Sequence, residues 1–554
     1  MRDNYGFKLI LTFIICICIC ISPMTTVFAN EVYSFNYAGG LSKEGIDNQD
    51  AIYYTDSYFE VPSTTYQPKL ATASCCLAFA GFGSNAMYRT TPPSYSQSPV
   101  NLLSLMKSLS FTNIEIADYY TQTPRADSIA YGFGYKLITI KDETGADTTI
   151  PLVVVGIRGA NYRSEWVSNT TVGINGNHSG FESASMQVLT ALKAYIQEHE
   201  DLNGQDIKLW ISGFSRAGAV SNVSGGFIND AIFQGNTHSL LSANISQDDL
   251  YIYTFEAPPP TIESDAHSDK YRNIFNVVNP NDLVPLLSIS PDAEATFVRY
   301  GIDKKLISST TSNKFTEIEE QVKAIYNKIY NTTYIQDKFR YSALNLPPLI
   351  NSLFKIETHD TQSEFLQHFS HKLSENLIGK RGIYIDNYQK AMQILLSFYY
   401  SDSKYTQSAQ YNLFLDYLKN NSGAYFLETV SVITTKTVDH WPDTLAKSFH
   451  NLLKDAQTHS NLTLSQNHDQ FENLENSFKI VVNNLLHDQE NLLELLNTLF
   501  EGITFSSNIQ GIIQAHTPGL CISWLKIMDE NYVGDAALSP DDVFVTNAHP
   551  APSF

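Results

Sequence analysis

The feature that most constrains this chain is an apolar run that leads directly into a serine flanked by small residues. Residues 206–220 read DIKLWISGFSRAGAV. The apolar residues 209–211 are typical of a buried parallel strand. Gly213 and Ala217 stand two residues before and two residues after Ser215. Small side chains there let a helix pass close behind the strand after a strained turn. We therefore predict a strand, an abrupt turn with Ser215 at its apex, and a helix.

The pattern G-x-S-x-small has two interpretations. Many α/β proteins contain a strand-to-helix turn built from small residues that has no reactive role. In the alternative interpretation, the turn presents the Ser215 hydroxyl as a nucleophile. The strand before the pattern and the helical residues 216–233 favour this second interpretation, and no other stretch of the chain matches the pattern.

The first 29 residues have the features of a secretory signal peptide. Two basic residues, Arg2 and Lys8, precede an apolar stretch of 13 residues, 9–21, and the segment ends in Val27-Phe28-Ala29. This apolar stretch is shorter than the ~20 residues that span a bilayer. We predict cleavage after Ala29 and a secreted, extracellular protein with no transmembrane span in the mature chain. An uncleaved membrane anchor is the alternative.

Charge and cysteine content restrict the partners. The formal net charge is −21, which disfavours nucleic acid and anionic lipid because both select basic patches. No metal or cofactor is expected, since neither zinc-type Cys/His spacing nor a phosphate-binding glycine loop is present.

The mature chain keeps Cys75, Cys76 and Cys521. We expect three buried free thiols rather than a disulfide scaffold. A bridge from Cys521 to Cys75 or Cys76 is the alternative.

Strands and helices alternate through the middle of the chain, which predicts an α/β fold with a mostly parallel central sheet. Later residues have helical periodicity and few glycines, which indicates a large α-helical insertion, or cap. The predicted divisions are a signal peptide (1–29), a helical lead-in packed on the core (30–120), the α/β core (121–295), the helical insertion (296–508), the end of the core (509–535) and a tail without an assigned fold (536–554).

A serine becomes a nucleophile when an imidazole takes its proton, and a carboxylate holds that imidazole in the correct tautomer. Asp282 is the preferred acid because it follows the apolar strand predicted over 273–279. Its alternative role is that of a turn aspartate, since Pro-Asn-Asp favours turns. His516 is the preferred base because it is the last histidine before the tail and shortly precedes a helix. The weaker candidates are Asp265 and Asp269 for the acid and His440 for the base.

Acyl transfer also requires backbone N–H groups that face the developing oxyanion. The N–H of Arg216, at the start of the predicted helix, is one candidate donor. The second is expected from the loop at Gly159-Ala160, directly after the β-branched strand predicted over 150–157.

Several stretches resemble the class 3 (fungal-type) lipases of the α/β-hydrolase fold, in the same order and at similar intervals. They are VVVGIRGA at 153–160, HSGF at 178–181, the serine turn, YTFEAP at 253–258 and residues 277–285, with a short piece around His516. The resemblance implies a serine esterase or lipase with Ser215, Asp282 and His516 as its triad. It also implies that Ala160 and Arg216 are the oxyanion donors.

The chain departs from the family pattern at the site itself. The family usually has histidine, leucine and glycine around the serine, where this chain has Phe214, Arg216 and Ala217. Ala160 stands where the family usually has threonine or serine, and the interval from acid to histidine is far longer. The resemblance therefore implies ester hydrolysis without specifying long-chain triacylglycerol as the substrate.

Three functional hypotheses follow. The first is a secreted carboxylic-ester hydrolase that forms an acyl-enzyme from an ester or lipid substrate. This hypothesis allows transient contact with a lipid interface. The second is a hydrolase-fold protein, weak or inactive as a catalyst, whose insertion binds partners at a surface. The third is a peptidase on the same fold. Activity of a Ser215→Ala variant separates the first two, and peptide versus ester substrates separate the third.

Overall fold

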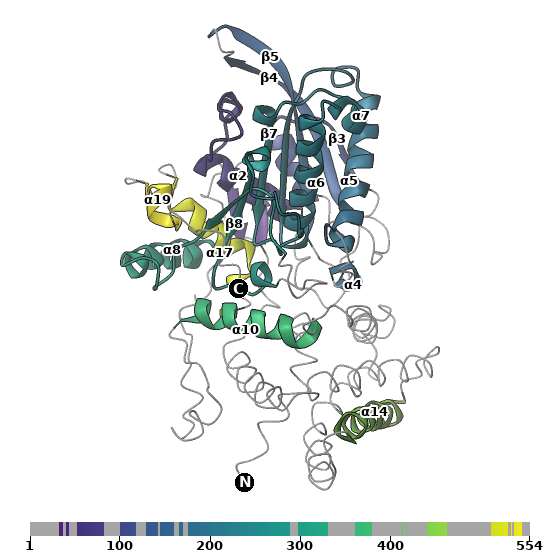
Figure 1. Ribbon diagram of the computed structural model, residues 1–554. Coiled ribbons are helices and arrows are strands. Elements are labelled where there is room, and N and C mark those ends of the chain that lie inside the picture. The colour runs from purple at the N-terminus through teal and green to yellow at the C-terminus, as the bar shows by residue number, and fades with distance from the viewer. Residues whose placement is uncertain are drawn as a thin grey trace.

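The computed structural model (Figure 1) describes the central part of the chain and separate segments of its remainder. The described residues are 33–36, 40–43, 53–81, 100–117, 129–141, 145–159, 166–169, 176–287, 297–330, 361–378, 413, 417, 421, 440–461, 511–512, 514–529, 533 and 537–545. The predicted signal peptide and Ala160 lie outside them.

A seven-stranded sheet organises the protein. Its strands lie in the order β3-β4-β5-β6-β7-β8-β9. β3 pairs antiparallel with β4 and β4 with β5, whereas every neighbouring pair from β5 to β9 is parallel. The strands are β3 (Thr112–Ile116), β4 (Tyr131–Lys141), β5 (Asp147–Ile157), β6 (Lys208–Phe214), β7 (Leu250–Phe255), β8 (Ile274–Val278) and β9 (Ile302–Lys305). A separate hairpin joins β1 (Tyr33–Asn36) and β2 (Gly40–Lys43).

Helices cover both faces of this sheet. α5 (Ser179–Glu198), α6 (Arg216–Phe233) and α7 (Thr237–Leu241) lie on one face, and α2 (Pro68–Ala80), α3 (Val100–Ser108), α8 (Phe315–Tyr330) and α17 (Pro518–Lys526) pack on the other. β6 contributes side chains to the cores on both faces of the sheet, because successive side chains of a strand point to opposite faces. Leu209 and Ile211 enter the core under α5 and α6, while Trp210 and Phe214 enter the core under α2.

The mixed sheet with helices on both faces is consistent with an α/β-hydrolase-like fold. The prediction of a mostly parallel sheet is confirmed, and α6 has the predicted bounds. Two segments differ from the prediction. Residues 302–305, assigned to the insertion, form the edge strand β9. The start of the tail forms α19 (Pro540–Val543), and Phe544 is buried and bridged to Leu306. Both segments are short, and tertiary pairing rather than local pattern determines them.

Three described helices belong to the predicted insertion, namely α8, α10 (Gln362–Ile378) and α14 (Trp441–Ser460). α10 lies at the end of the sheet toward which β5 to β8 run (Figure 1). Its buried Gln362 Nε2 donates a hydrogen bond of 2.8 Å to the backbone oxygen of Asn281. The insertion therefore contacts the loop that follows β8.

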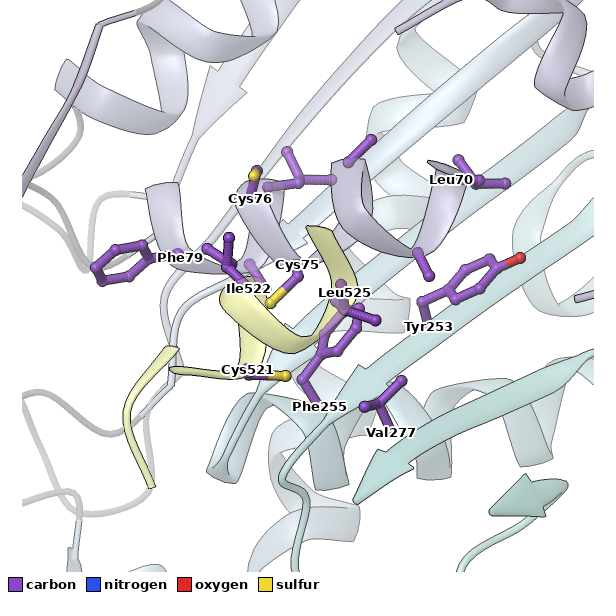
Figure 2. Close-up of a cluster of buried hydrophobic side chains, with 14 of the residues drawn as sticks. Leu70, Cys75, Cys76, Phe79, Tyr253, Phe255, Val277, Cys521, Ile522 and Leu525 are labelled. Atoms are coloured by element: carbon purple, nitrogen blue, oxygen red, sulfur yellow. The ribbon is translucent and has the colours of Figure 1, made fainter. Parts of the chain in front are cut away.

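Cys75, Cys76 and Cys521 are buried free thiols, as predicted. Cys75 and Cys76 lie on α2, and Cys521 lies on α17, which packs against α2 (Figure 2). Across the described part of the chain, no helix is both long enough and apolar enough to cross a membrane.

Candidate active site

The turn after β6 places Ser215 in a strained conformation. Its φ of 58° and ψ of −126° lie outside the regions that L-residues ordinarily occupy, which costs about 1–3 kcal/mol. The Ser215 N–H donates to the Phe255 oxygen of β7 at 2.8 Å. A Cβ added to Gly213 would lie 2.2 Å from the Ala217 oxygen. Only glycine fits there, so the close passage of α6 behind β6 explains the predicted small residue.

The loop after β8 presents Asp282. Its side chain is fully buried, and Oδ1 accepts a 2.9 Å hydrogen bond from the Val284 N–H. The Asp282 N–H donates to the Asn279 oxygen at 3.0 Å. This is the local turn chemistry expected of Pro-Asn-Asp. It leaves Oδ2 facing the carboxyl end of β6.

His516 comes from a distant segment that ends in α17. This helix packs against α2 and α8. His516 Nδ1 lies 2.6 Å from Asp282 Oδ2, and Nε2 lies 2.9 Å from Ser215 Oγ. Because a carboxylate only accepts, Nδ1 carries the hydrogen and Nε2 is free to accept from the serine hydroxyl. The structure thus joins the three predicted side chains in one hydrogen-bonded chain.

Burial differs among these three side chains. The exposed fraction is 1% for the Asp282 side chain, 19% for that of His516 and 8% for Ser215. The carboxylate is therefore kept from solvent while the other two groups remain reachable. Phe214 packs beside the imidazole, with ring centroids 5.2 Å apart, so the residue that departs from the family pattern helps to hold His516.

The buried Arg216 side chain points away from the serine. Its Nε and Nη2 donate to Ser168 Oγ at 3.2 and 2.9 Å, and Ser168 belongs to α4 (Trp166–Asn169). The nearby His178 Nε2 lies 3.1 Å from the Asn169 oxygen. Burial, together with the Arg216 charge, lowers the pKa of His178 to about 4. The Arg216 N–H stands at the first position of α6, directly after Ser215.

The weaker candidates lie apart from this cluster. Asp265 and Asp269 are exposed, and Asp265 pairs with Lys270 at 3.2 Å. His440 is exposed at the start of α14. Ala160, the other predicted oxyanion donor, lies outside the described residues.

Sequence reasoning missed Glu256, directly after β7. It is fully buried, and its Oε2 accepts a 2.8 Å hydrogen bond from the Asn279 N–H. Its position offered a signal, because it directly follows a mostly apolar strand, and a carboxylate is rarely buried unless it is paired. The described residues contain no cluster of three or more side chains that could hold a metal ion.

Comparisons with known proteins give limited similarity. No protein-family model and no curated protein matches the chain. The lipase of Rhizomucor miehei in its propeptide complex matches at 17% identity, over 32% of this chain and 58% of that one, with a TM-score of 0.22. The lipase of Rhizopus microsporus var. chinensis matches at 16%, over 44% and 76%, with a TM-score of 0.27.

A triacylglycerol lipase described as having a serine protease triad at its catalytic centre matches at 15% identity, over 44% of this chain and 83% of that one, with a TM-score of 0.26. These three proteins are described as lipases. Such matches do not show membership of their family, and lipase activity is a property of those proteins.

Proposed function

We propose that the protein is a secreted serine esterase or lipase that hydrolyses carboxylic esters through an acyl-enzyme. The single observation that carries this proposal is the hydrogen-bonded chain from Asp282 through His516 to Ser215, with contacts of 2.6 and 2.9 Å. The strained backbone of Ser215 supports it, since strain of this kind clusters at functional sites.

In the proposed reaction, Ser215 Oγ attacks the ester carbonyl carbon while His516 Nε2 takes the hydroxyl proton. The tetrahedral intermediate collapses as its bond to the alcohol oxygen breaks, and His516 returns the proton to the leaving alcohol. Water then attacks the acyl-serine, His516 accepts and returns a proton, and the carboxylic acid departs. The Asp282 carboxylate orients the imidazole and stabilises the imidazolium.

The developing oxyanion requires preorganised N–H donors. We assign one donor to the N–H of Arg216, because it stands at the first position of α6, directly after Ser215. Ala160 is the second proposed donor. Removal of one such donor typically lowers kcat by about 10²–10³-fold.

A fluorophosphonate probe tests the proposal directly, since it forms a covalent bond only with an activated serine. We expect one adduct on Ser215, together with turnover of p-nitrophenyl esters, and loss of both in Ser215→Ala while the circular dichroism spectrum is unchanged. His516→Ala should slow the labelling. A folded parent protein that neither labels nor turns over esters of any chain length would contradict the proposal and favour the binding hypothesis.

We propose further that the helical insertion caps the Ser215 cleft and determines acyl-chain preference. The hydrogen bond from Gln362 to Asn281 supports this, because it joins α10 to the loop that bears Asp282. Replacement of the insertion by a short linker should change the ratio of turnover between short and long p-nitrophenyl esters. An unchanged chain-length profile would contradict the cap.

A further inference from the structure

Outside the three proposed catalytic residues, the most unusual group near them is the Glu256 side chain. We infer that Glu256 is a positioning residue, which acts as a neutral hydrogen-bond acceptor that fixes Asn279 and through it the loops bearing Asp282 and His516. This inference rests on the proposed ester hydrolysis and deepens it.

Backbone strain at Glu256 is the first observation. Its φ is 48°, a left-handed conformation that is unfavourable for a residue with a side chain. Glycine would relieve this strain. β6 and β7 are parallel neighbours, and each is followed by a strained polar residue, Ser215 and Glu256. The strain is in keeping with a requirement for the carboxyl at this place.

Asn279 connects this carboxyl to both loops. Its N–H donates to Glu256 Oε2 at 2.8 Å, and its Oδ1 accepts from the Asn281 N–H at 3.0 Å. Its backbone oxygen accepts from the Asp282 N–H at 3.0 Å. Its Nδ2 donates to the Ala515 oxygen at 3.4 Å, one residue before His516. A shift of Asn279 would therefore displace acid and base together.

The surroundings of Glu256 favour its neutral form. Burial and then the negative charge of Asp282 raise the pKa of Glu256 well above its usual range, which the Asn279 N–H only partly offsets. The other titratable groups that face it are the Cys75 thiol of α2 and the Cys521 thiol of α17. Glu256 Oε1 is buried and has no nitrogen or oxygen partner among the described residues, as suits an uncharged carboxyl better than an ionised one.

This position requires an acceptor oxygen without a charge, so Glu256→Gln and Glu256→Met are matched variants. Glutamine keeps an oxygen for the Asn279 N–H and imitates the neutral carboxyl, while methionine keeps the length and removes the acceptor. We expect Glu256→Gln to keep kcat within about threefold of the parent. We expect Glu256→Met to lower kcat at least tenfold with KM within twofold, because a displacement of about 1 Å at reacting groups can cost 10²-fold.

The pH profile tests whether Glu256 is neutral in the folded protein. With Glu256 already neutral, the acidic limb of kcat/KM in Glu256→Gln should coincide with that of the parent. If Glu256 were ionised, its replacement would remove a negative charge near the histidine, and the acidic limb would move to lower pH. A displacement of more than half a pH unit would overturn the inference.

Circular dichroism and thermal unfolding establish that the variants are folded. If Glu256→Met does not fold, Glu256→Asp takes its place, since it withdraws the carboxyl by one methylene and should lower kcat where Glu256→Gln does not. If the parent protein is labelled at Ser215 but a folded Glu256→Met or Glu256→Asp variant has a parent-like kcat, the inference is overturned. Absence of that labelling in the parent would instead overturn the proposed function and, with it, this inference.

Discussion

Two regions supply the three side chains of the candidate site, and they are built differently. Ser215 and Asp282 follow β6 and β8, which belong to one sheet in which parallel strands end at the same edge. His516 stands 234 residues after Asp282 and precedes α17. The first pair is positioned by backbone pairing within a sheet, and the histidine by packing between helices.

This difference explains how the fold accommodates a long insertion between Asp282 and His516: the segment that bears His516 is held in place by the buried helix α17. Leu520, Ile522 and Leu525 of α17 are fully buried in the core shared with α2 and α8. Loop-closure entropy grows only slowly with loop length. The packing of the buried face of α17 can therefore position His516 at the edge of the sheet, although the insertion separates it from Asp282 in sequence.

The largest expected effect tests whether the two regions act as one unit. His516→Ala should lower kcat by about 10⁴–10⁶-fold, and the double variant with Ser215→Ala should be no slower than the slower single variant, because the residues act together. The measurement is p-nitrophenyl ester turnover. His440→Ala is the control and should be parent-like. Additive losses in the double variant would contradict a joint role.

The second effect concerns the contribution of the sheet. Asp282→Asn should lower kcat by about 10⁴-fold, since an amide at this position favours the wrong imidazole tautomer. Asp265→Asn is the matched control, because Asp265 is exposed on the loop before β8. Equal turnover by both variants would show that Asp282 is only a turn residue.

The third effect tests the anchoring of the histidine. Leu525→Ala on α17 and Leu192→Ala on α5 remove equally buried side chains, and each should lower the free energy of unfolding by about 2–5 kcal/mol. Leu192 lies in the second half of α5, away from the carboxyl edge of the sheet. We therefore expect kcat at 25 °C to fall about tenfold or more in Leu525→Ala and less than twofold in Leu192→Ala. Equal losses would show that α17 does not position His516.

The smallest expected effect concerns how the free energy of unfolding depends on pH through His178, the residue directly before α5. Burial lowers the pKa of His178 to about 4, below the usual ~6.5 that it regains on unfolding. The unfolded chain therefore binds this proton first, and stability is lost as pH falls from 6.5 toward 4. Between pH 7 and 5 the loss should be about 2 kcal/mol. Thermal midpoints should thus fall several degrees less in His178→Gln than in the parent protein. Equal falls would contradict the lowered pKa.

Local sequence patterns determined much of the sheet region. The apolar residues of β5, β6 and β8 predicted a buried parallel sheet, and Gly213 with Ala217 predicted the turn at Ser215. Each of these features depends on side chains close together in sequence, for which period and residue size are informative. Asp282 could be placed for the same reason, since its turn chemistry immediately follows an apolar strand.

Only the tertiary structure decided the remainder. The edge strand β9 has little apolar character, Phe544 is buried through its bridge to Leu306, and Glu256 has its partner 23 residues further along the chain. The predicted base could be named from the sequence, but its 2.9 Å contact with Ser215 depends on α17 packing across 301 residues of separation. Sequence periodicity reports which face of an element is buried, whereas the partner that buries it is a property of the whole fold.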